Sequence, residues 1–109
     1  MLKQHSSQTA LVCDLTALNA EERERHQVVL EQLQKLVQEV KDLPQGYTFR
    51  LVADTATLLF IAEFMMLESC CCPFLDLRLD IETEQGPAWL TLTGPEGVKE
   101  FLKAELGIG

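Results

Sequence analysis

The sequence predicts an α+β protein, a two-layer sandwich in which helices cover one face of a four-stranded mixed sheet. Apolar residues make up 47% of the 109 residues, enough for one two-layer core. Some segments carry apolar residues at helical spacing, and several shorter ones alternate apolar and polar residues, as half-buried strands do. The predicted order is β-α-β-α-β-β-α. We expect residues 1–8 to form a flexible N-terminus and residues 9–107 to form a single domain.

The first half of the chain predicts a strand, a helix and a second strand. Residues 9–15 are predicted as a short strand with Cys13 on its apolar face. Asn19 and Glu22 are spaced as a helix-capping pair, so a helix is expected to begin there and to end before Pro44. Its apolar stripe consists of Val29, Leu33, Leu36, Val40 and Leu43. Residues 46–53 then alternate, which predicts a strand with one solvated face.

The second half predicts a helix, a hairpin and a last helix. Asp54 is a natural N-cap for a helix over residues 55–71, which is apolar on nearly all sides and is stopped by Pro73. Residues 74–82 and 88–93 alternate around a turn, which predicts a hairpin. Pro95 opens a helix that continues to Leu106. The polar face of the sheet is expected to be solvated or to pair with a partner.

Charge and hydropathy exclude several classes of partner. Seventeen acidic residues against nine Lys and Arg give a net charge of −8, and no basic run is present, so we expect no nucleic-acid partner. The longest apolar stretch, residues 56–67, is too short to cross a bilayer, and no secretory signal is evident. We therefore expect a cytoplasmic protein with no membrane partner, with reduced thiols and no disulfide framework.

The run Cys70-Cys71-Cys72 is the main chemical clue. Adjacent thiols present two soft donors to one ion, so Cys71 and Cys72 are candidate ligands for zinc, copper(I), mercury or trivalent arsenic. Glu68 lies one helical turn earlier and could supply an oxygen. His26, on the apolar stripe of the first predicted helix, could supply a nitrogen, and Cys13 could supply a third sulfur.

Each of these candidates also has a purely structural reading. Cys13 fits a buried core cysteine, His26 a core histidine with a satisfied hydrogen bond, and Glu68 a solvated charge near a helix end. If the first two strands are parallel, Cys13 lies at the opposite edge of the sheet from Cys71 and Cys72. The spacing of the cysteines does not match a zinc finger.

The segment that begins at Glu68 and continues through CCPFLDLRLDIE, together with PAWLTLTGPEGVKEFL, resembles a family of small uncharacterised bacterial proteins with an E-x-x-C-C-P-F motif. The resemblance spans residues 13–106. Members are often encoded beside heavy-metal or arsenic resistance genes. The resemblance implies that Cys13, Glu68, Cys71 and Cys72 are the positions of interest, whereas Cys70 lies outside the pattern. It implies no particular reaction.

Three functions compete. The first is a binding protein whose vicinal cysteines hold a thiophilic metal or metalloid. The second is a structural or interaction module with buried structural cysteines, a homodimer through the apolar second helix or the open sheet face. A thiol enzyme ranks last, because no CxxC pair or activated nucleophile at a helix N-terminus is present, and we name no catalytic residue.

Overall fold

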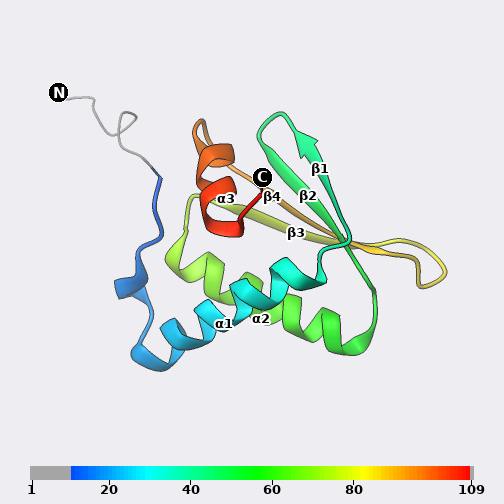
Figure 1. Ribbon diagram of the computed structural model, residues 1–109, viewed down its shortest axis with the longest axis horizontal. Coiled ribbons are helices and arrows are strands. Elements are labelled where there is room, and N and C mark those ends of the chain that lie inside the picture. Colours follow the sequence, from blue (N-terminus) through cyan, green and yellow to red (C-terminus); the bar gives the residue numbers. More distant parts are fainter. Residues whose placement is uncertain (1–10, 109) are drawn as a thin grey trace.

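The structure, a computed structural model, describes residues 11–108 and has the predicted α+β architecture with a four-stranded sheet (Figure 1). Its elements are, in order, the short 3₁₀ helix η2 (Leu15–Ala17), α1 (Ala20–Leu36), β1 (Glu39–Leu43), β2 (Gly46–Leu51), α2 (Thr55–Cys71), β3 (Asp76–Ile81), β4 (Ala88–Thr93) and α3 (Val98–Leu106). The predicted flexible segment, residues 1–8, lies outside the described residues.

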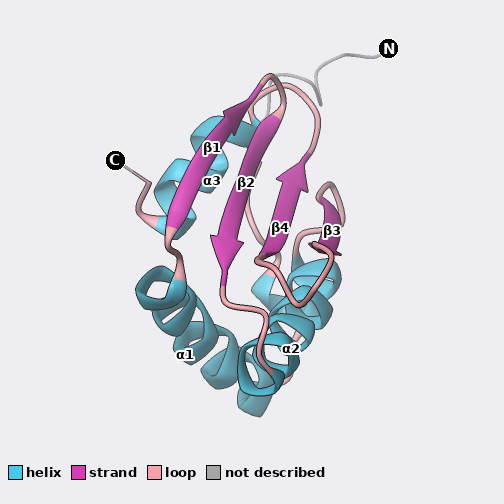
Figure 2. Ribbon diagram, turned by 90° about the vertical axis from the view of Figure 1, so that its right-hand side faces the viewer, coloured by secondary structure: helices cyan, strands magenta, loops and turns pink. Residues whose placement is uncertain are grey.

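The sheet is antiparallel throughout, so the prediction of a mixed sheet was wrong. The strand order is β1-β2-β4-β3, and each neighbouring pair runs antiparallel. Two hairpins, β1–β2 and β3–β4, join through β2 and β4 (Figure 2). Hairpins need only short connections, whereas the parallel pair that a mixed sheet contains would have needed a crossover.

The extra strand β1 forms where the sequence predicted the end of a helix. Helix α1 ends at Leu36, and Val37 is already extended, with φ −67° and ψ 126°. Val40 pairs with Phe49 in the ladder, and Gln38 N–H donates to the Arg50 carbonyl at 2.8 Å. Apolar residues three apart fit a helical stripe, but here pairing with β2 satisfies the backbone instead, and β-branched Val37 and Val40 suit that conformation.

The predicted first strand is absent from residues 11–15, and residues 9 and 10 lie outside the described part of the chain. Asp14 instead caps η2, accepting a hydrogen bond from Thr16 N–H at 3.1 Å. An Asp side chain that bonds the backbone two residues on favours a turn over a strand. Cys13 therefore lies in a loop.

All three helices lie on one face of the sheet, as Figure 2 shows. Alternate residues of β2 and β4 are buried toward the helices, namely Tyr47, Phe49, Leu51, Ala88, Leu90 and Leu92. They belong to one core with the buried side chains of the helices, including Val29, Leu33, Ile61, Phe64 and Leu102. The other face is polar, as expected: Thr48 and Thr91 hydroxyls bond at 2.8 Å, and Lys41 Nζ lies 4.5 Å from the centre of the Trp89 ring.

Candidate metal centre

The C-terminal end of α2 places Glu68, Cys71 and Cys72 in the interior. The helix begins where Asp54 accepts a hydrogen bond from Thr57 N–H at 2.8 Å. It ends at Cys71 because Pro73 cannot continue it, and the capping residue Cys72 donates its N–H to the Glu68 carbonyl at 2.7 Å. The bounds of this helix are those predicted. All three side chains have 0% exposure, so the reading of Glu68 as a solvated charge was wrong.

Cys13 reaches the same place from the N-terminal segment. Asp14 N–H donates to the Cys71 carbonyl at 2.7 Å, which holds the loop against the end of α2. Cys13 and Cys72 form a disulfide, with their Cα atoms 4.8 Å apart. The expectation of four reduced thiols without a disulfide was wrong. The loop conformation of Cys13 removes the objection that a parallel first strand would place it at the opposite edge of the sheet. Sequence spacing could not reveal a pairing that the loop around Asp14 creates.

His26 enters the cluster from α1. This helix begins with the predicted capping box, in which Asn19 and Glu22 each bond the backbone N–H of the other at 2.8 and 2.9 Å. His26 lies on the buried side of α1 and is 5% exposed. Its Nε2 lies 2.7 Å from Glu68 Oε1 and 3.7 Å from Cys71 Sγ. The ring therefore has a hydrogen-bond partner and is also within reach of a thiol.

Glu105 on α3 completes the cluster, and the sequence analysis missed it. Its Oε2 lies 2.9 Å from Cys13 Sγ. Because a disulfide sulfur carries no proton, a hydrogen bond here must be donated by the carboxyl group. Glu105 follows Leu102 by three residues and Val98 by seven, so it lies on the buried stripe of α3. The signal in the sequence that could have identified Glu105 was a carboxylate on the apolar stripe of the last predicted helix.

Together these side chains form two overlapping groups of possible ligands. One donor atom each from Cys13, His26, Glu68 and Cys71 lie within 4.8 Å of one another. The same holds for Cys13, Glu68, Cys72 and Glu105. We call these six residues the cysteine cluster. The structure thus brings together all five residues singled out in the sequence, and adds Glu105. Cys70 is exposed and belongs to neither group.

The cysteine cluster is largely buried and holds Cys71 and Glu105 in their protonated forms. Burial raises the pKa of the Cys71 thiol to about 12, with further contributions from the charges of Glu68 and Glu105. Burial, followed by the charge of Glu68, raises the pKa of Glu105 to about 9. A thiol in this state is a poor nucleophile, which argues against thiol catalysis. A bound cation would reverse this effect, because it favours the deprotonated thiol.

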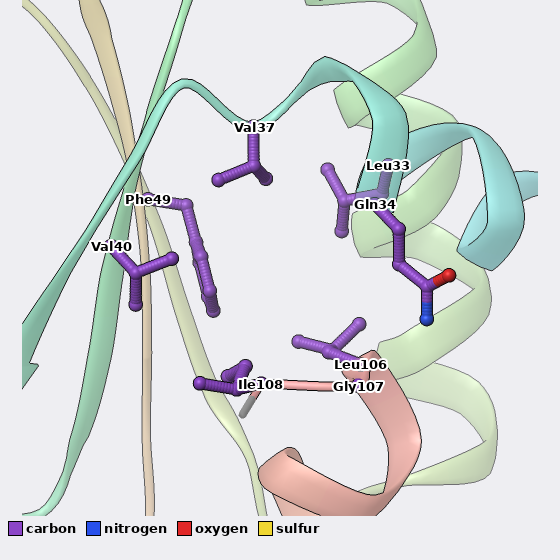
Figure 3. Close-up of a pocket in the computed structure, with 8 residues that line it drawn as sticks. All are labelled: Leu33, Gln34, Val37, Val40, Phe49, Leu106, Gly107 and Ile108. Atoms are coloured by element: carbon purple, nitrogen blue, oxygen red, sulfur yellow. The ribbon is translucent and has the colours of Figure 1, made fainter.

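A separate pocket of about 420 Å³ lies between the C-terminal part of α1, the β1–β2 hairpin and the end of α3 (Figure 3). It is lined by Leu33, Gln34, Val37, Val40, Phe49, Leu106, Gly107 and Ile108. None of these residues belongs to the cysteine cluster, and none has an ionisable side chain. The pocket can offer apolar contact but no acid–base or metal chemistry.

Comparison with protein-family models, with curated proteins and with solved structures gives no match for this chain. Among the helices of residues 11–108, none has both the length and the apolar character needed to span a membrane. The functional argument therefore depends on the geometry of the cysteine cluster.

Proposed function

We propose that the reduced protein binds a thiophilic metal ion or metalloid through Cys71 and Cys72, with Cys13, Glu68 and His26 as further donors. The observation that carries the proposal is that the donor atoms form two overlapping groups, each within 4.8 Å, around the fully buried Glu68, Cys71 and Cys72. Isolated buried charges are costly, so a protein that gathers them at one point needs a compensating charge or proton there.

The spacing of the donors suits a four-coordinate ion. A tetrahedral zinc centre holds neighbouring ligands about 3.3–3.8 Å apart, as its metal–sulfur and metal–nitrogen distances require. Cys71 Sγ lies 3.5 Å from Cys72 Sγ and 3.7 Å from His26 Nε2. These two edges already have the required length. Copper(I), mercury and trivalent arsenic also prefer sulfur and remain candidates.

Binding requires the dithiol form of the protein. The Cys13–Cys72 disulfide occupies two of the sulfur donors, and a disulfide lacks the thiolate charge that holds a soft ion. The function therefore belongs to a reducing compartment such as the cytoplasm. Together with the family resemblance of the segment that begins at Glu68, this supports a role in bacterial heavy-metal resistance.

Native mass spectrometry of the reduced protein, titrated with zinc, mercury(II) or arsenite, tests the proposal. We expect a one-to-one adduct with at least one of them at stoichiometric concentration. Cys70→Ser is the matched control, because it removes a neighbouring thiol that is exposed and outside the cysteine cluster. The adduct should survive in Cys70→Ser and disappear in the double variant Cys71→Ser/Cys72→Ser. An adduct that persists in the double variant, or none in the wild type, would refute the proposal.

A structural interaction module is the second candidate, and two observations favour it. The Cys13–Cys72 disulfide links segments 59 residues apart, as a stabilising disulfide does. On the outer side of α2, Leu59 and Met66 are 68% and 63% exposed. These side chains could form the contact of a homodimer. Equilibrium sedimentation at high micromolar concentration should then show a dimer that Leu59→Glu disrupts.

A further inference from the structure

The cysteine cluster includes two carboxyl groups, which a site that binds its ligand through sulfur alone would not need. Glu68 from α2 and Glu105 from α3 contribute donor oxygens to the group formed with Cys13 and Cys72. Glu68 is fully buried although it carries a carboxyl group, and Glu105 is half-buried beside the Cys13 sulfur. Two carboxyl groups at one buried place repel each other when both are ionised.

Both carboxyl groups keep an oxygen without a partner. Glu68 Oε1 bonds to His26, and Glu105 Oε2 lies against Cys13 Sγ. Glu68 Oε2 and Glu105 Oε1 are buried and have no hydrogen-bond partner within the described residues. Buried polar atoms in native proteins are nearly always satisfied, so two such acceptors at one place need a positive charge between them, either a proton shared by the carboxyl groups or a bound cation.

From these contacts, and on the premise that the proposed function holds, we propose that Glu105 and Glu68 make the centre select a four-coordinate divalent cation, such as Zn²⁺ or Cd²⁺. Thiolate, imidazole and carboxylate are the ligands that zinc takes in proteins. The cluster offers all three kinds. In this arrangement Glu105 is the specificity-determining residue, because it adds an anionic oxygen next to the sulfurs.

The two carboxyl groups do not strengthen the binding of trivalent arsenic. Arsenite at neutral pH is the uncharged As(OH)₃, and it binds by exchanging its three hydroxyls for three thiols. Each new As–S bond replaces an As–O bond, and the thiol proton leaves with the hydroxyl as water. The product is neutral and uses only sulfur donors, so its stability does not depend on a nearby carboxylate. Removing the carboxylate of Glu105 should therefore weaken the binding of Cd²⁺ but not that of arsenite.

The experiment compares Cd²⁺ and arsenite binding to the full chain, reduced and free of metal. In Glu105→Gln we expect the dissociation constant for Cd²⁺ to rise at least about tenfold, as loss of groups that support a metal site does. Affinity for arsenite should change much less than affinity for Cd²⁺, because Glu105 forms no bond to arsenic. Glutamine keeps the shape and hydrogen-bonding capacity of the side chain, so a role limited to hydrogen bonding would leave Cd²⁺ binding unchanged.

Glu100→Gln is the matched control, because it removes one carboxylate from an exposed position on the same helix. It should leave both affinities unchanged. Equal Cd²⁺ affinity in the wild type and Glu105→Gln would overturn this inference while leaving the proposed function intact. Failure of the reduced wild type to bind Cd²⁺, Zn²⁺, mercury(II) or arsenite would instead remove the proposed function, and the inference with it.

X-ray absorption of the Zn²⁺-loaded wild type provides a second measurement that does not depend on the folding of a variant. The inference requires light scatterers, oxygen or nitrogen, beside sulfur in the coordination shell, at about 2.0–2.2 Å from zinc. A shell composed only of sulfur would overturn it.

Discussion

Helices α1 and α3 line two sites of opposite character. At the cysteine cluster they contribute His26 and Glu105, and at the apolar pocket they contribute Leu33 and Leu106. Glu105 and Leu106 are neighbours in the chain, so a rotation of about 100° around α3 separates an ionisable site from an apolar one. The cluster has buried carboxylate oxygens without a hydrogen-bond partner, whereas the pocket has open space and no buried unsatisfied polar side chain.

This difference shows which feature carries functional information. An apolar hollow at the surface costs a protein little and can arise wherever helices diverge from a sheet. Buried carboxylate oxygens without partners cost stability, so their presence demands an explanation. The cysteine cluster is therefore the stronger candidate site, although the pocket has the volume of a small-ligand site.

The largest expected effect is the loss of Cd²⁺ affinity when Cys13 and Cys72 of the cysteine cluster are oxidised. Glutathione disulfide would take two electrons from the Cys13 and Cys72 thiols, which lose two protons and form their disulfide while two glutathione molecules are released. The oxidised protein should bind Cd²⁺ at least about a hundredfold more weakly than the reduced protein, since two ligands are lost. Calorimetric titration of both forms measures this. Equal affinities would mean that these two sulfurs are not ligands.

The next effect concerns the pH dependence of the metal-free, oxidised protein. In the folded state the pKa of Glu105 is raised to about 9, from an ordinary value of 4.5. The folded state therefore holds a proton that the unfolded chain has released, and stability falls as pH rises between these values. The slope for one proton is at most about 1.4 kcal/mol per pH unit, and partial exposure of Glu105 should reduce it.

Urea unfolding between pH 5 and pH 8.5 measures this dependence, with Glu105→Gln as the comparison. In this variant the free energy of unfolding should fall much less as pH rises, because the glutamine side chain does not titrate. The Cys71 thiol, with its pKa raised to about 12, contributes only at higher pH. Parallel curves for the wild type and the variant would show that Glu105 is not the group responsible.

The smallest effect is expected at the pocket. Gln34 is exposed and carries the one polar side chain among the pocket's lining residues. Gln34→Leu should change the free energy of unfolding by less than about 0.5 kcal/mol and leave Cd²⁺ affinity unaltered. Thermal denaturation and the same titration check both points. A change above about 1 kcal/mol would mean that the pocket residues contribute more to stability than their composition suggests, and that the pocket and the cysteine cluster differ less than described.

Helix α2 and the β3–β4 hairpin were predictable because their signals are local. Asp54 caps α2 and Pro73 stops it, so the bounds followed from the chain alone. The same spacing correctly placed Glu68, Cys71 and Cys72 near one another. Helix α1 was predicted too long, since the spacing of Val40 and Leu43 fits a helix and also the strand that pairs with β2.

The rest of the cysteine cluster depends on contacts that no local pattern encodes. Cys13 meets Cys72 because the loop at Asp14 bonds to the end of α2. Glu105 meets Cys13 across 92 residues, through the packing of α3 against the rest of the core. Its position on an apolar stripe was a warning, but a buried carboxylate can be identified only once its neighbours are known.

The disulfide divides the chain into a covalent ring and a free remainder. The ring from Cys13 to Cys72 encloses α1, β1, β2 and α2, whereas β3, β4 and α3 follow outside it. Of the six residues of the cysteine cluster, Glu105 is the one contributed from outside the ring. The ion binds the reduced protein, in which this ring is open. An ion that coordinates Glu105 would therefore take the place of the disulfide and would also link residues 73–108 to the rest of the chain, so binding and release would alter how cooperatively the two parts unfold.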